Sequence, residues 1–165
     1  MVQNPRPRPR GSEPPGSDLN FDINRILRIL PHRAPFLLID RVLDINPRTS
    51  ARALKNITYN EPMMVGHFPG APVFPAVLTL EAMSQLMCVL AYASDEIDPN
   101  LQTFAFAGID KAKFRHAIVP GDQLVIEVRV LQQRNNVWKC EGTALVGDVL
   151  CAEAELLAAV QDRED

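Results

Sequence analysis

The sequence predicts an α+β domain in which one long buried helix is wrapped by an antiparallel sheet of about five or six strands. Residues 76–94 are apolar on every helical face and contain neither proline nor glycine, which is typical of a helix enclosed on all sides. Residues 101–160 alternate between strand-like runs and short turns, which is typical of an antiparallel sheet. A sheet that wraps the helix satisfies both patterns.

The chain of 165 residues fits one domain with a sizeable core. We expect this domain at residues 19–160, between a disordered tail over residues 1–18 and a charged end over residues 161–165. The tail is rich in proline and arginine, and prolines with fixed φ and no N–H group forbid regular helix or sheet. It lacks the apolar segment of a signal peptide, so we expect a cytoplasmic protein. The tail could contact an acidic partner or act only as a solubilising extension.

Composition argues against several classes of partner. The net charge of −3 excludes a generally basic nucleic-acid surface. The three cysteines are widely spaced and form no C-x-x-C pair, so neither a metal site nor a dithiol redox site is expected. The apolar run of residues 76–94 carries Glu81 and Gln85, which favours a buried helix over a membrane span.

Shorter elements are predicted on both sides of the long helix. Asp22 is a candidate N-cap for a short helix that ends at Pro31. Strands are predicted over residues 36–45, 50–57, 101–115, 123–134, 137–146 and 149–160. A loop over residues 60–75, rich in proline and glycine, leads into the long helix. Because one sheet need not cover every face of that helix, we expect a dimer in which two sheets join edge to edge.

Two ionisable residues stand out near the junction of this loop and the helix. His67 lies in the loop, and Glu81 is the only charged residue of the helix. A histidine in apolar surroundings stays neutral and can accept a proton, whereas a carboxyl group there is expected to keep its proton. A neutral base and a protonated acid suit the elimination of water from a 3-hydroxyacyl thioester. On the residues alone, ordinary structural roles stay open for both.

Two further positions of the helix could support such chemistry. The first N–H groups of a helix are unpaired and carry partial positive charge, so the helix start near Ala76 could stabilise a developing oxyanion. Gln85 lies four residues after Glu81, on the same helix face. It could orient Glu81, or it could be a core polar group that is bonded to backbone.

Four ordered blocks of sequence resemble one known family. Residues 66–85 read GHFPGAPVFPAVLTLEAMSQ, and they resemble the active-site motif of the 3-hydroxyacyl-[acyl-carrier-protein] dehydratases of FabZ type. The other blocks are LPHRAPFLLIDRV at 30–42, Lys55-Asn56 with Asn60-Glu61-Pro62, and GIDKAKFR at 108–115 with Pro120-Gly121-Asp122. The likeness covers about residues 19–160.

The resemblance implies a hot-dog fold and a role in fatty-acid elongation. It implies dehydration of (3R)-hydroxyacyl-acyl carrier protein to the trans-2-enoyl form, with His67 as general base and Glu81 of the dimer mate as general acid. The substrate would bring its own phosphopantetheine arm, so no metal or organic cofactor is expected. The family often forms a trimer of dimers. A sister family with isomerase activity has aspartate at the position of Glu81, which favours dehydration alone here.

One departure from the family pattern keeps two rival functions open. The family usually has glycine at the position of Ala76, and the backbone N–H of that residue is the implied oxyanion donor. Ala76 retains the N–H, but a left-handed φ there would cost an alanine roughly 1–2 kcal/mol. A non-catalytic acyl-carrier binding module is therefore one rival. The other is a thioesterase on the same fold, since a fold does not fix function.

Two smaller groups of residues have both a functional and an ordinary interpretation. Phe104 and Phe106 share one strand face and could line an acyl tunnel or simply pack in the core. Lys111, Lys113 and Arg115 alternate along the same predicted strand, so they should project to one side. This basic row could dock an acidic carrier protein or form a solvated sheet face. His32 is interpreted as structural, and His116 has no assigned role.

Overall fold

The structure is a computed structural model that describes residues 20–94, 97–98 and 100–162. The predicted tail and residues 163–165 lie outside this part of the chain. The helices are α1 (Ile23–Ile29) and α2 (Ala76–Ala93), with a short 3-10 helix η2 (Pro62–Val65). The strands are β1 (Arg41–Asn46), β2 (Ser50–Asn56), β3 (Gln102–Phe114), β4 (Gln123–Arg134), β5 (Val137–Val146) and β6 (Val149–Asp162).

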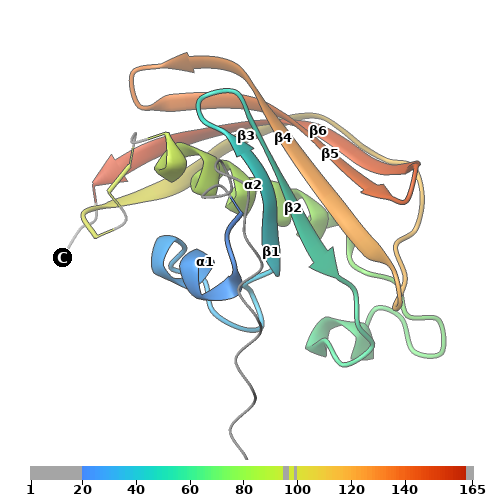
Figure 1. Ribbon diagram of the computed structural model, residues 1–165. Coiled ribbons are helices and arrows are strands. Elements are labelled where there is room, and N and C mark those ends of the chain that lie inside the picture. Colours follow the sequence, from blue (N-terminus) through green and yellow to red (C-terminus); the bar gives the residue numbers. More distant parts are fainter. Residues whose placement is uncertain (1–19, 95–96, 99, 163–165) are drawn as a thin grey trace, which may run out of the picture.

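The described strands form one antiparallel sheet in the order β1-β2-β4-β5-β6-β3. Figure 1 shows this sheet curving around α2, with α1 beside β1. The predicted fold class is confirmed, as are the hairpin of β1 with β2 and the consecutive pairing of β4, β5 and β6. Strand β6 runs two residues beyond its predicted end, because Asp162 still pairs with Gln102 of β3.

Helix α2 forms the centre of the core. Its residues from Thr79 to Ala91 are buried except for Glu81, which is partly exposed. The helix is long and apolar enough to cross a membrane, but 67% of it is buried inside the fold, so the sheet accounts for its apolar character. The helix and the sheet approach closely at Gly142 of β5, where an added Cβ would lie 2.7 Å from the sulfur of Met83.

Helix α1 forms as predicted. The side chain of Asp22 accepts a hydrogen bond from the backbone N–H of Arg25 at 2.9 Å, so Asp22 is the N-cap. Ile26 and Ile29 are buried, and they give α1 one apolar face toward the core.

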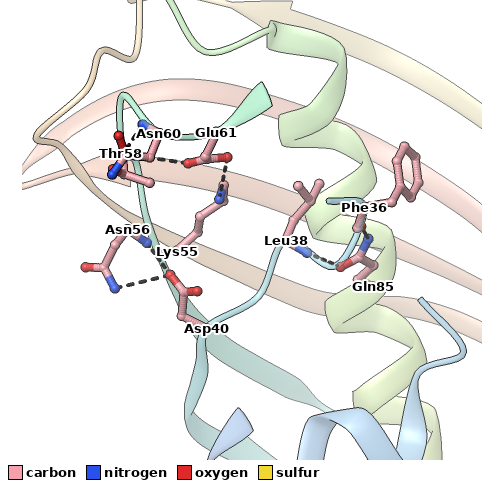
Figure 2. A network of polar contacts seen from close by, with 9 residues as sticks. All are labelled: Phe36, Leu38, Asp40, Lys55, Asn56, Thr58, Asn60, Glu61 and Gln85. Carbon is pink, nitrogen blue, oxygen red and sulfur yellow. Dashed lines mark hydrogen bonds and ion pairs between the residues drawn. The ribbon is translucent and has the colours of Figure 1, made fainter. Parts of the chain in front are cut away.

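The strand predicted from residue 36 is wrong at its start, because β1 begins only at Arg41. The preceding backbone bonds to a side chain of α2 in place of a neighbouring strand (Figure 2). The N–H of Leu38 donates to Gln85 Oε1 at 2.9 Å, and Gln85 Nε2 donates to the carbonyl of Phe36 at 2.8 Å. These bonds satisfy the buried backbone without a sheet ladder.

Candidate active site

A buried ion pair anchors the loop that carries His67 (Figure 2). Lys55 Nζ, at the end of β2, lies 3.0 Å from Glu61 Oε2, and the two side chains are only 6% and 12% exposed. Glu61 Oε1 accepts the backbone N–H of Thr58 at 3.0 Å. Lys55 Nζ also lies 5.3 Å from the centre of the Phe74 ring, within the range of a cation–π contact. Lys55 therefore touches both the beginning and the end of this loop.

Replacing Lys55 with methionine is expected to destabilise the protein by about 3–5 kcal/mol, because it leaves the buried Glu61 carboxylate without its cation. Urea unfolding at one fixed protein concentration measures this change. Lys113→Met is the matched control, because Lys113 pairs with Glu153 at 3.4 Å but is 61% exposed. We expect the control to cost at most about 1 kcal/mol. Equal destabilisation by the two changes would contradict the anchoring role of Lys55.

The imidazole of His67 is held in one orientation by its own loop. Its Nδ1 lies 2.8 Å from the carbonyl oxygen of Val73, and the ring stacks on Phe68 with centroids 4.1 Å apart. A carbonyl oxygen can only accept, so Nδ1 carries the hydrogen of the neutral ring. Nε2 is then left with a free lone pair, which is what a proton acceptor requires.

His67 lines a cavity of about 370 Å³ at the start of α2. The cavity is formed by the loop, by the first turn of α2 and by the end of β3 with the residues that follow. Ala76 is the first residue of α2, and the preceding Pro75 gives no side-chain cap. The uncapped N–H groups of this turn therefore add partial positive charge beside His67.

Ala76 is not strained in this structure. The non-glycine residues with positive φ in the described part of the chain are Arg48, Lys111 and Asn135, and Ala76 is not among them. An alanine therefore fits this position without a left-handed backbone, and it retains the N–H group.

Glu81 lies in a second cavity, of about 240 Å³, which Phe104 and Phe106 also line. Gln85 Nε2 donates to Glu81 Oε1 at 2.9 Å while the same side chain bonds the backbone of Phe36 and Leu38. Gln85 thus contacts Glu81 and also bonds the core backbone. The two phenylalanines lie on the wall of the cavity that holds Glu81.

Two histidines that the sequence interpretation left without a functional role lie in these cavities. His32 Nε2 is 3.3 Å from Glu81 Oε1, and burial lowers the pKa of His32, although the charge of Glu81 opposes that shift. His116 lines the cavity of His67. His32 belongs to the family-like block at residues 30–42, and His116 directly follows the block at residues 108–115. Their places in or beside these blocks are the sequence signal that could have pointed to them.

His67 and Glu81 do not meet within one chain. Their cavities share no lining residue. The His67 cavity includes Phe114 at one end of β3, whereas the Glu81 cavity includes Phe104 near the other end. One chain on its own thus presents His67 and Glu81 at two separate places.

The predicted basic row is paired with acidic residues of β6. Lys111 bonds Glu155, and both Lys113 and Arg115 contact Glu153, at 3.4 Å and 2.7 Å. A bulge in β3 lies between Asp110 and Lys113, where Lys111 has a positive φ of 53°, and it replaces simple alternation there. The three cations gather on one exposed face, where their carboxylate partners offset much of their charge.

The fold is also found in solved structures of low sequence identity. The dehydratase heterocomplex ApeI:P from Xenorhabdus doucetiae matches with a TM-score of 0.70 and 17% identity, over 84% of this chain and 91% of that chain. The uncharacterized protein PH1136 from Pyrococcus horikoshii matches with a TM-score of 0.63 and 11% identity, over 83% of this chain and 94% of that chain. The molecule is a hot-dog protein.

Sequence comparison identifies the family of the chain within this fold. The FabA-like domain family matches residues 30–155. The 3-hydroxyacyl-[acyl-carrier-protein] dehydratase FabZ of Sorangium cellulosum is 50% identical over 146 residues, which are 88% of this chain and 94% of that protein. The dehydratase of the same name from Campylobacter hominis is 51% identical over 145 residues, which are 87% and 99% of the two chains. The chain belongs to the FabA-like family, among its FabZ-type dehydratases.

Proposed function

We propose that the protein converts (3R)-hydroxyacyl-acyl carrier protein to the trans-2-enoyl form and water, as a step of fatty-acid elongation. The observation that carries this proposal is the hydrogen bond of His67 Nδ1 to the Val73 carbonyl. It leaves Nε2 as a base in a cavity beside an uncapped helix start. Relatives at about half identity, which are named for this reaction, support the choice of substrate.

The chemistry follows from three groups. His67 Nε2 takes the proton from C2 of the substrate, and the electron pair passes through an enolate to form the C2–C3 double bond. The N–H of Ala76 stabilises the enolate oxygen at the positive end of α2. As the bond from C3 to oxygen breaks, Glu81 gives its proton to the departing hydroxyl group, which leaves as water.

A dimer built through β3 would unite base and acid. Strand β3 forms one edge of the sheet, and it exposes Phe106, Ile109 and Phe114 by 39%, 45% and 48%. If the β3 edges of two copies pair antiparallel about a two-fold axis, the Phe114 end of one strand lies beside the Phe104 end of the other. His67 of one subunit then faces Glu81 of the partner subunit. Three such dimers would make the hexamer that the family often forms.

Acyl carrier protein is the proposed partner of this protein. The phosphopantetheine arm arrives with the acyl carrier protein, and the His67–Glu81 chemistry requires neither a metal nor an organic cofactor. The row of Lys111, Lys113 and Arg115 is the proposed docking face for the acidic carrier, with Arg115 at the rim of the His67 cavity. Phe104 and Phe106 would line the acyl tunnel. We place the protein in the cytoplasm.

A pair of assays on one substrate tests the activity. A 3-hydroxyacyl thioester of N-acetylcysteamine is incubated with the full chain, and enoyl absorbance and free thiol are followed in parallel. A rise in enoyl absorbance without thiol release is expected. Thiol release without enoyl formation would indicate the thioesterase alternative. The assay is repeated with the acyl group attached to acyl carrier protein. If neither enoyl nor free thiol forms from this substrate either, a binding module is indicated.

Ala76→Gly tests whether the alanine limits the reaction. We expect kcat to change by less than about threefold, because the N–H is the same and Ala76 is not strained. Stability should fall by at most about 1 kcal/mol, the helix cost of glycine. Kinetics with short and long acyl thioesters measure the effect. A large gain for long chains alone would instead show that the methyl group narrows the cavity.

A further inference from the structure

The carboxyl group of Glu81 is oriented by a side chain whose own orientation is fixed. The backbone N–H of Leu38 can only donate, so it must meet the oxygen of the Gln85 amide, at 2.9 Å. The NH₂ group of Gln85 is thereby turned toward the Phe36 carbonyl and Glu81 Oε1. Oε1 of Glu81 therefore always receives one donor from this side (Figure 2 shows the part formed by Phe36, Leu38 and Gln85).

His32 approaches the same oxygen from a rigid turn. The guanidinium of Arg33 donates to the carbonyls of Leu27, Leu30 and His32 at 3.1, 2.8 and 2.7 Å. These bonds tie the backbone of His32 to the end of α1. The His32 ring stacks on Phe36 with centroids 6.0 Å apart, and its Nε2 lies 3.3 Å from Glu81 Oε1.

The environment of the other ring nitrogen favours one form of His32. Burial lowers the pKa of His32 and favours the neutral ring. Its Nδ1 is buried and has no hydrogen-bond partner among the described residues. A buried N–H without an acceptor costs the full desolvation of that donor. A hydrogen on Nε2 avoids that orphaned donor and directs it at Glu81 instead.

We propose that His32 is a positioning residue for Glu81: with Gln85 it donates to Oε1, and it thereby assigns the acid proton to Oε2. Two donors on one carboxyl oxygen make that oxygen the carbonyl oxygen of the protonated group. The proton then sits on the one atom that can face the substrate. At 3.3 Å the contact is longer than an ordinary hydrogen bond, as catalytic hydrogen bonds often are before a substrate binds. This inference rests on the proposed function, because it concerns the same acid.

A matched set of variants tests the inference by kinetics. His32→Gln keeps an amide N–H near the position of Nε2, whereas His32→Leu removes the donor. With a 3-hydroxyacyl thioester, His32→Leu is expected to lower kcat about tenfold, the effect of one ordinary hydrogen bond, with little change in KM. His32→Gln should recover most of that loss. Equal kcat for wild type and His32→Leu, or equal losses in both variants, would overturn the proposal.

Glu81→Gln, assayed beside the His32 variants, distinguishes failure of the proposed acid role of Glu81 from failure of the positioning role of His32. Wild-type turnover by Glu81→Gln would remove the proposed acid, and the positioning role would fall with it. An inactive Glu81→Gln together with a fully active His32→Leu would overturn the positioning role alone. Melting temperatures of all variants show whether a loss of kcat reflects unfolding.

A second measurement does not depend on the stability of the leucine variant. The ¹⁵N chemical shifts of the imidazole nitrogens report which nitrogen of each neutral histidine carries the hydrogen. His32→Gln identifies the signals of His32 among those of the three histidines. We expect the Nε2–H form for His32 in the wild-type chain. The Nδ1–H form would overturn the proposal.

Discussion

Replacing His67 with alanine is expected to lower kcat by about 10²- to 10⁴-fold, the range that a positioned general base contributes. The variant retains the helix start and the cavity but has no group to take the C2 proton. Glu81→Gln is expected to fall in the same range, because the amide keeps the shape of the side chain but cannot release a proton to the leaving hydroxyl. The initial rate of enoyl formation from a 3-hydroxyacyl thioester measures both.

Glu141→Gln is the control for these two variants. Glu141 pairs with Arg129 on the exposed face of the sheet, at 2.6 Å and with 43% of its side chain exposed. It should retain wild-type turnover and lose at most about 1 kcal/mol of stability. Unchanged activity of His67→Ala and of Glu81→Gln would refute the catalytic assignment.

Mixing the two inactive variants is expected to restore about a quarter of wild-type activity if dimers exchange subunits at random. Half of the dimers then contain one subunit of each kind. Such a dimer combines the intact His67 of the Glu81→Gln subunit with the intact Glu81 of the His67→Ala subunit, which makes one working site. The other site of the mixed dimer carries both changes and stays inactive.

This recovery of activity requires that one subunit supplies His67 and the other supplies Glu81 to the same site. The double variant His67→Ala/Glu81→Gln, mixed with either single variant, provides the control and should restore no activity. Exchange itself is verified by capturing one tagged variant and detecting the other. Exchange without recovery would show that the two residues do not form a site across the β3 edge.

The sequence predicted the elements whose signal is local. Helix α2 was found because residues 76–94 are apolar on every face, and the strands β4 and β5 were found to the residue because polar and apolar positions alternate. The segment before Arg41 was assigned to a strand because it contains a continuous apolar run. Its actual partner is the side chain of Gln85, 47 residues away from Leu38, and no local pattern encodes that contact.

The candidate site was predictable to a similar extent. His67, Ala76 and Glu81 were found because a rigid loop, a helix start and a lone carboxyl group have recognisable local chemistry. His32 was interpreted as structural because its approach to Glu81 exists only after α1 packs beside α2. The separation of His67 from Glu81 within one chain likewise follows from tertiary structure, since the two residues lie only 14 positions apart in the sequence.

The close approach of Gly142 to Met83 lies on the side of α2 opposite Glu81. Met83 and Glu81 are two positions apart, so they point to nearly opposite faces of α2. A side chain at position 142 would overlap Met83, since an added Cβ would lie 2.7 Å from its sulfur and 3.2 Å from its Cγ, so the Met83 side chain would have to shift. The packing of α2 against β5, on the side of the helix opposite Glu81, therefore depends on a glycine that lines neither the His67 cavity nor the Glu81 cavity.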